Sequence, residues 1–343
     1  MKYSEGANKT SVTEFVILGF SDNSDINLVL FLFFLFVYIL TVLGNFLLIL
    51  IIVVDPALHT PTSISSSLHT PMFFFLRNLS FLDLCYTSVT VPKMLANLLS
   101  DSKTISFASC AMQMFFFLFF GITECFLLAS MAYDRYSAIC NPLRYTAIMN
   151  KKVCLQLIGG SWVCGTVAAV EHTSLLFTLP FCGPNTINHF FCDIQAVLKL
   201  VCGNTYWIEI HIILGVGFFL LMPLLMSLLL SYVAIISTIL KIKTAEGRHR
   251  AFSTCSSHLI VVTLCYGTAL ITYARPKFSY GMGEVKIFSL FYSVGIAVLN
   301  PIIYSFQNKE VKNALRKIPI TSFDLGFLDG ELTTDTDGLK AQL

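Results

Sequence analysis

The sequence predicts an all-α membrane protein, a bundle of seven transmembrane helices. Only 12% of its 343 residues are charged and 55% are hydrophobic, whereas about a quarter of the residues in soluble domains are charged. Seven apolar stretches are long enough to cross a bilayer, which takes ~20 residues, and none alternates as barrel strands do. These stretches are Leu28–Val54, Met72–Leu99, Phe107–Ala132, Val153–Leu179, Ile208–Leu240, Ala251–Ala274 and Val285–Phe306.

The loop charges predict the orientation in the membrane. Lys and Arg gather in the loops of one side, which is expected to be cytosolic, so the N-terminus lies outside. We expect an extracellular segment (1–27), the bundle (28–306), a short amphipathic helix on the membrane surface (307–318) and a disordered acidic tail (319–343). Asn8 opens an Asn-Lys-Thr glycosylation acceptor on the outer side. The net charge of +2 is too small to suggest nucleic acid.

An acid–base pair, Asp134 and Arg135, lies where the third span leaves the membrane. One interpretation is a switch, because Arg135 can bind Asp134 locally and reach another partner when the surrounding helices move. The other interpretation is an interfacial Arg with its counter-ion. Later in the chain, Pro301 in the seventh span frees a backbone carbonyl, so that helix can kink and pivot.

Three polar residues interrupt the first three spans. Asn45 is expected to face other helices and hydrogen bond there. Asp83 and Glu124 form a buried pair of carboxyl groups, which cannot both ionise without a cation or a shared proton. A protonated structural pair and a site for a small cation are both consistent with this pattern.

Cysteines cluster on the outer side, at positions 110, 182, 192 and 202. Two disulfides are therefore plausible, with three possible pairings. His189 and Asp193 flank Cys192 and suggest a soft-metal site. A disulfide at Cys192 beside a solvated His189 explains the pattern better, so no metal site is predicted.

Several motifs together carry a resemblance to a known family. They are Gly44-Asn45, Leu68-His-Thr-Pro-Met72, Leu79-Ser-Phe-Leu-Asp83, Met131-Ala-Tyr-Asp-Arg-Tyr136, Ser231-Tyr232, Ala251-Phe-Ser-Thr-Cys-Ser-Ser-His258 and Asn300-Pro-Ile-Ile-Tyr304. In this order, the chain resembles the rhodopsin-like G-protein-coupled receptors, and among them the vertebrate olfactory receptors of the terrestrial-type subclass. The resemblance covers about Glu14 to Ile318.

The resemblance implies roles for particular residues. Cys110 would pair with Cys192, and Cys182 with Cys202. Asp134 and Arg135 would form a cytosolic latch, and the tyrosines that meet Arg135 in the active state would be Tyr232 and Tyr304. Asp83 and Glu124, with Asn45 nearby, would form a central polar site able to hold a sodium ion, and no other cofactor is implied.

The family also implies a ligand and partners. A small volatile odorant would bind in the outer half of the bundle and activate a stimulatory G protein, which raises cyclic AMP. The expected ligand contacts are Phe117, Leu118, Gly121, Ile122, Val216, Tyr266, Ala269, Leu270, Tyr273 and Ser293. Such a receptor would be a multi-pass protein of the plasma membrane and not an enzyme.

The chain departs from the family pattern in four places. Ser137 replaces a usual apolar residue, Gln307 replaces a usual Arg, His59–Leu68 is an insertion, and the acidic tail is long. The insertion and the tail are expected to affect coupling and expression more than ligand binding.

Three other classes of function fit the sequence less well. A transporter or channel would need a polar path or inverted repeats, and only two acids lie near the midplane. A membrane enzyme would need a catalytic cluster, and the adjacent pair Glu171 and His172 is weak evidence for one. We interpret the pair as polar packing near the outer boundary. A receptor of the same fold that works outside olfactory tissue is the nearest alternative, and its site of expression would distinguish it.

Overall fold

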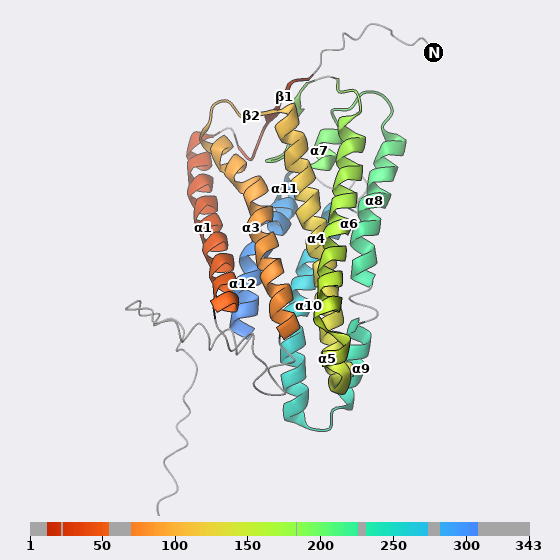
Figure 1. Ribbon diagram of the computed structural model, residues 1–343. Coiled ribbons are helices and arrows are strands. Elements are labelled where there is room, and N and C mark those ends of the chain that lie inside the picture. The colour runs from red at the N-terminus through yellow and green to blue at the C-terminus, as the bar shows by residue number, and fades with distance from the viewer. Residues whose placement is uncertain are drawn as a thin grey trace, which may run out of the picture.

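The computed structural model describes residues 12–21, 23–54, 70–182, 184–225, 231–273 and 282–307. Long helices run side by side along one common direction, with a small sheet at one end (Figure 1). The helices of the bundle are α1 (Ser24–Val54), α3 (Thr70–Leu99), α4 (Phe107–Cys140), α6 (Lys151–Phe177), α8 (Tyr206–Leu225), α9 (Val233–Lys241), α10 (Ala245–Tyr273), α11 (Met282–Leu290) and α12 (Ile296–Gln307). Short helices lie at Pro142–Arg144 (η2), Tyr145–Ile148 (α5) and Ile194–Leu198 (α7).

Helix α4 is the centre of the bundle. In its most apolar window 61% of the residues are buried, against 28% in α1 and 22% in α8. It packs against α3, α6, α8, α9 and α10. Residues on α4 are therefore within reach of most other helices, which is why the site described below is built around it.

Five helical stretches in the described part of the chain are long and apolar enough to cross a membrane, and α3 and α10 complete the bundle beside them. Large apolar side chains cover the outer surface of α1, including Leu32, Phe33 and Phe36. Such a surface suits lipid rather than water. Together these features confirm the predicted all-α membrane bundle.

The predicted spans differ from the helices mainly where the backbone is irregular. The fifth predicted span contains α8 and α9, and two π-helical residues, Ser231 and Tyr232, lie directly before α9; residues 226–230 between the helices lie outside the described part. The seventh contains a five-residue π-helix, η4 (Phe291–Gly295), between α11 and α12. The third helix continues past the predicted end at Ala132 to Cys140, because the polar residues of that turn are buried rather than solvated.

A three-stranded sheet covers one end of the bundle, called the sheet end here. Strand β1 (Glu14–Ile17) lies between β2 (Thr104–Ser106), to which it is antiparallel, and β3 (Thr186–Ile187), to which it is parallel. Phe15 and Ile17 are fully buried beneath it. Strand β1 lies in the predicted extracellular segment, where no strand was expected, because strands this short carry no clear hydrophobic pattern.

Several sequence predictions fall outside the described residues. They are the glycosylation acceptor Asn8, the insertion His59–Leu68, nearly all of the predicted amphipathic helix, and the acidic tail.

Candidate functional site

A cavity of about 50 Å³ lies inside the bundle between α3, α4, α8, α10 and η4. Its lining residues are Tyr86, Phe117, Leu118, Gly121, Ile122, Glu124, Cys125, Val216, Leu220, Cys265, Ala269 and Tyr292. Most of these side chains are apolar, and a few polar groups converge on the same space. This combination is typical of a small-molecule site.

Six of the ten predicted ligand contacts line this cavity: Phe117, Leu118, Gly121, Ile122, Val216 and Ala269. Gly121 allows the Tyr86 ring to approach α4 closely, since a Cβ at position 121 would lie 3.3 Å from a ring carbon of Tyr86. Four of these six residues lie on one stripe of α4 that lines the cavity, and their contact with a ligand stays a prediction.

Three predicted contacts do not line it. Tyr266 donates its hydroxyl to the backbone carbonyl of Cys125 at 2.6 Å, so it fastens α10 to α4. Leu270 follows Ala269 and points about 100° further round the helix. Ser293 is fully buried, and its hydroxyl donates to the Leu290 carbonyl at 3.4 Å. The tenth predicted contact, Tyr273, has a side chain outside the described part.

Aromatic rings form one wall of the cavity. Tyr86 and Phe117 stack with their centroids 5.0 Å apart, and Tyr292 meets the edge of Phe117 at 5.8 Å. Phe191, from the loop between α6 and α8, packs on the same phenylalanine at 4.6 Å. The wall thus joins α3, α4, η4 and the loop.

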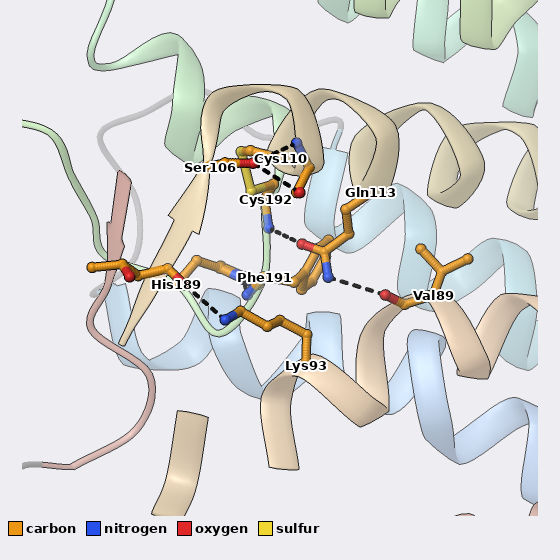
Figure 2. The surroundings of a disulfide bond; sticks show 10 residues. Val89, Lys93, Ser106, Cys110, Gln113, His189, Phe191 and Cys192 are labelled. Carbon is orange, nitrogen blue, oxygen red and sulfur yellow. Dashed lines mark hydrogen bonds between the residues drawn. A yellow bond between two sulfur atoms is a disulfide. The ribbon is translucent and has the colours of Figure 1, made fainter. Parts of the chain in front are cut away.

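The loop is held over the cavity by a disulfide and by one glutamine (Figure 2). Cys110, near the start of α4, is bonded to Cys192. Gln113, one turn along, accepts from the backbone N–H of Cys192 at 3.0 Å and donates to the Val89 carbonyl of α3 at 3.0 Å. A second disulfide joins Cys182 to Cys202, so the pairings are those that the resemblance implied.

His189 is part of the same loop but is not solvated as expected. It is 3% exposed, and its ring lies 4.5 Å from that of Phe190 and 4.6 Å from that of Phe191. Burial lowers the pKa of His189 to about 4, and the charges of Lys286 and Lys199 act in the same direction while Asp193 opposes them. The imidazole is therefore neutral at physiological pH.

Hydrogen bonds hold the central polar residues between helices. Asn45 donates to the Ala297 carbonyl at 3.0 Å, the carbonyl one helical turn before Pro301. Because proline cannot donate to that carbonyl, Asn45 satisfies it and ties α1 to α12. Asn300 donates to both carboxylate oxygens of Asp83, at 3.1 and 3.0 Å.

Asp134 and Arg135 form a closed ion pair in the half of the bundle away from the sheet. The Arg135 guanidinium donates to Asp134 at 2.6 Å, and both residues are buried. Tyr145 of α5 donates its hydroxyl to the other oxygen of the same carboxylate, also at 2.6 Å. Burial, followed by the Asp134 charge, raises the pKa of Tyr145 far above its usual range, so the tyrosine remains a donor.

The other switch residues lie near this pair but do not contact it through hydrogen bonds. Tyr232 bonds to His258 at 2.6 Å, and the second ring nitrogen of His258 lies 3.1 Å from the Leu128 carbonyl of α4. The Tyr304 hydroxyl is buried and has no hydrogen-bond partner among the described residues. Tyr304 nevertheless lies close enough to both Asp83 and Arg135 to interact with them electrostatically.

Comparison with known proteins agrees with this geometry. A model of the olfactory receptor family matches residues 34–321, most of the chain. The chain belongs to the olfactory receptor family. It is 54% identical to human olfactory receptor 10C1 over 312 residues, which cover 91% of this chain and 96% of that protein. It is 50% identical to human olfactory receptor 10A7 (90% and 95% covered) and 48% identical to mouse olfactory receptor 5AP2 (92% and 96% covered).

Family membership fixes the general role of this olfactory receptor. It is an odorant receptor that acts through G proteins, a multi-pass protein of the plasma membrane, and not an enzyme. Five residues that line the cavity of the receptor were not predicted: Tyr86, Cys125, Leu220, Cys265 and Tyr292. Tyr86 lies three residues after Asp83, so the two side chains share one face of the helix. This spacing could have predicted Tyr86 as a residue near the polar site. Tyr292 had no such signal, because it lies within a π-helix.

Proposed function

We propose that a small odorant binds in the cavity described above and favours a state in which α10 moves outward. The observation that carries this proposal is one cavity that combines an aromatic wall, a carboxyl group and six of the expected contacts. A ligand shifts such an equilibrium only by binding one state better, and a tenfold preference amounts to ~1.4 kcal/mol.

The opposite end would respond through the latch. Outward movement of α10 separates His258 from α4, which frees Tyr232, and opening of the Asp134–Arg135 pair exposes the guanidinium. Tyr232 and Tyr304 would then meet Arg135, with Pro301 as the pivot of α12. The partner is a G protein of the olfactory stimulatory type, and the output is cyclic AMP.

The proposed topology puts the sheet end outside the cell and the latch in the cytosol. Basic residues flank α9 and the start of α6 at the latch end, which agrees with the positive-inside tendency. Both disulfides then face the oxidising side, where disulfides persist. Asn8 would be glycosylated there.

The central polar residues fit a sodium ion. Three buried oxygens lack hydrogen-bond partners among the described residues, one each on Asn45, Glu124 and Asn300. Oxygen ligands and uncompensated carboxylates suit a hard cation. Asp83 and Glu124 would hold the ion, and its charge would offset the repulsion between them.

Cavity filling tests the binding site. In cells that carry the receptor at the surface, an odorant panel should identify active ligands by cyclic AMP output. Ala269→Leu should lower the potency of those ligands at least tenfold, because Ala269 lines the cavity. Thr263→Leu places the same leucine side chain on an exposed face of α10 and should leave potency unchanged. Silence of the surface-expressed receptor to the whole panel, or equal responses of both variants, would contradict the proposal.

A further inference from the structure

A carboxyl group in the cavity wall has one buried oxygen whose hydrogen-bonding capacity is unused. Glu124 lines the cavity and is 5% exposed. Its Oε1 atom has no hydrogen-bond partner in the described part of the protein. A buried acceptor of this kind costs free energy until a donor reaches it. A ligand that brings a donor to this point therefore gains affinity.

No basic side chain balances the charge of Glu124 among the cavity residues that the structure describes. Asp83 lies close enough to interact electrostatically with Glu124, and its own two oxygens are already bonded to the Asn300 amide. No Lys, Arg or His is among the cavity residues that the structure describes. Two neighbouring carboxyl groups need a positive charge or a proton between them. Asp83 does not line the cavity, so Glu124 is the carboxylate that a ligand meets.

The aromatic wall points to the same chemistry. The rings of Tyr86, Phe117 and Tyr292 line the cavity that Glu124 enters, and they are packed against one another. Aromatic faces attract cations, most strongly where water is excluded. An unpaired carboxylate oxygen beside three aromatic rings is a favourable environment for an ammonium group.

We propose that the cavity binds a short aliphatic amine in its ammonium form. One N–H donates to Glu124 Oε1, the positive charge lies against the aromatic wall, and the alkyl chain packs on Ile122 and Val216. An alcohol of the same shape offers one donor and no charge, so it binds more weakly. A cavity of about 50 Å³ has room for about four water-sized groups, which suits a chain of about four carbons.

This inference rests on the proposed odorant site and names its ligand class. Glu124 is also a proposed sodium ligand, so amine and sodium would bind in competition. An amine retains its positive charge at neutral pH, as the side chain of lysine does.

The experiment compares n-butylamine, 1-butanol and butyrate on cells that carry the unmodified receptor at the surface, with cyclic AMP as the readout. We expect butylamine to be at least tenfold more potent than 1-butanol, and butyrate to be inactive. Glu124→Gln should lower butylamine potency at least tenfold while the response to 1-butanol persists. Glu171→Gln removes an exposed carboxylate that pairs with His211, and it should leave butylamine potency unchanged.

Each failure has a distinct meaning. Equal potency of 1-butanol and butylamine on the unmodified receptor overturns the amine proposal, and this comparison needs no variant to fold. A surface-expressed Glu124→Gln receptor that keeps its butylamine potency within twofold also overturns it. A receptor that answers other odorants but no amine overturns the ligand class and leaves the odorant site standing. Silence to every odorant contradicts the proposed function itself.

Discussion

Removing one hydroxyl from the latch should activate the receptor without a ligand. Tyr145 is 1% exposed, and its hydroxyl donates to Asp134 at 2.6 Å while Arg135 holds the other carboxylate oxygen. Tyr145→Phe retains the ring and its packing. It leaves one buried carboxylate oxygen without this donor and weakens the closed latch.

The magnitude follows from the type of bond. A hydrogen bond to a charged group contributes about 1.5–3 kcal/mol. If the open state lacks the bond between Tyr145 and Asp134, the substitution raises the ratio of open to closed receptors by about tenfold to a hundredfold, since ~1.4 kcal/mol is tenfold. Basal signalling should rise accordingly until the open state dominates.

The assay is basal cyclic AMP per receptor at the surface, together with nucleotide exchange on the G protein in isolated membranes. Tyr133→Phe is the matched control, because Tyr133 is 40% exposed and its ring contact with Tyr136 survives the change. A Tyr145→Phe receptor with unchanged or lower basal output, at equal surface density, would show that the bond does not hold the latch closed.

Three further predictions concern packing and pH. Gly165→Ala should destabilise the receptor by about 1–3 kcal/mol, because its Cβ would lie 2.6 Å from a backbone carbonyl oxygen of α4. In the control, Gly160→Ala, the added Cβ has open space on the same helix. Thermal unfolding in detergent should therefore give a lower melting temperature for Gly165→Ala than for Gly160→Ala. Gly121→Ala should lower odorant potency about tenfold, or ~1.4 kcal/mol, by narrowing the cavity against a tyrosine ring at 3.3 Å, whereas Gly217→Ala has space and should not. The pKa of His189 is lowered to about 4 in the folded state, so the folded protein favours the neutral imidazole. The stability of the fold is therefore unaffected by His189 above pH ~6.5. As the pH falls from there toward 4, the unfolded chain takes up a proton and the free energy of unfolding decreases by up to about 3 kcal/mol. His189→Gln should flatten the fall in melting temperature between pH 7.5 and pH 5, and an equally steep fall would exclude His189 as its source.

Local patterns in the sequence were sufficient to predict those features that depend on neighbouring residues alone. Long apolar runs predicted the helices, because a bilayer requires ~20 apolar residues per span. The acid–base pair at Asp134 and Arg135 followed from its position at the end of such a run. Asn45 was expected to find a partner on another helix, and it binds the Ala297 carbonyl near Pro301.

The rotation of each helix about its own axis decides which of its residues face the cavity. Hydropathy does not give this rotation. Ser293 was predicted on the seventh helix, but its neighbour Tyr292 lines the cavity. The π-helix at that point adds a residue to the turn and changes the phase of every side chain around it. Strand β1 likewise depends on partners far away in the chain, at β2 and β3.

Local patterns in the chain predict a membrane helix bundle, a resemblance to the olfactory receptors, and the position of the latch. Only the packing of the helices brings Tyr86, Glu124 and Tyr292 to one cavity and places the Tyr145 hydroxyl on Asp134. The reason is physical. Composition and periodicity describe one helix at a time, whereas a cavity and a hydrogen bond between distant residues exist only after several helices have packed at fixed rotations.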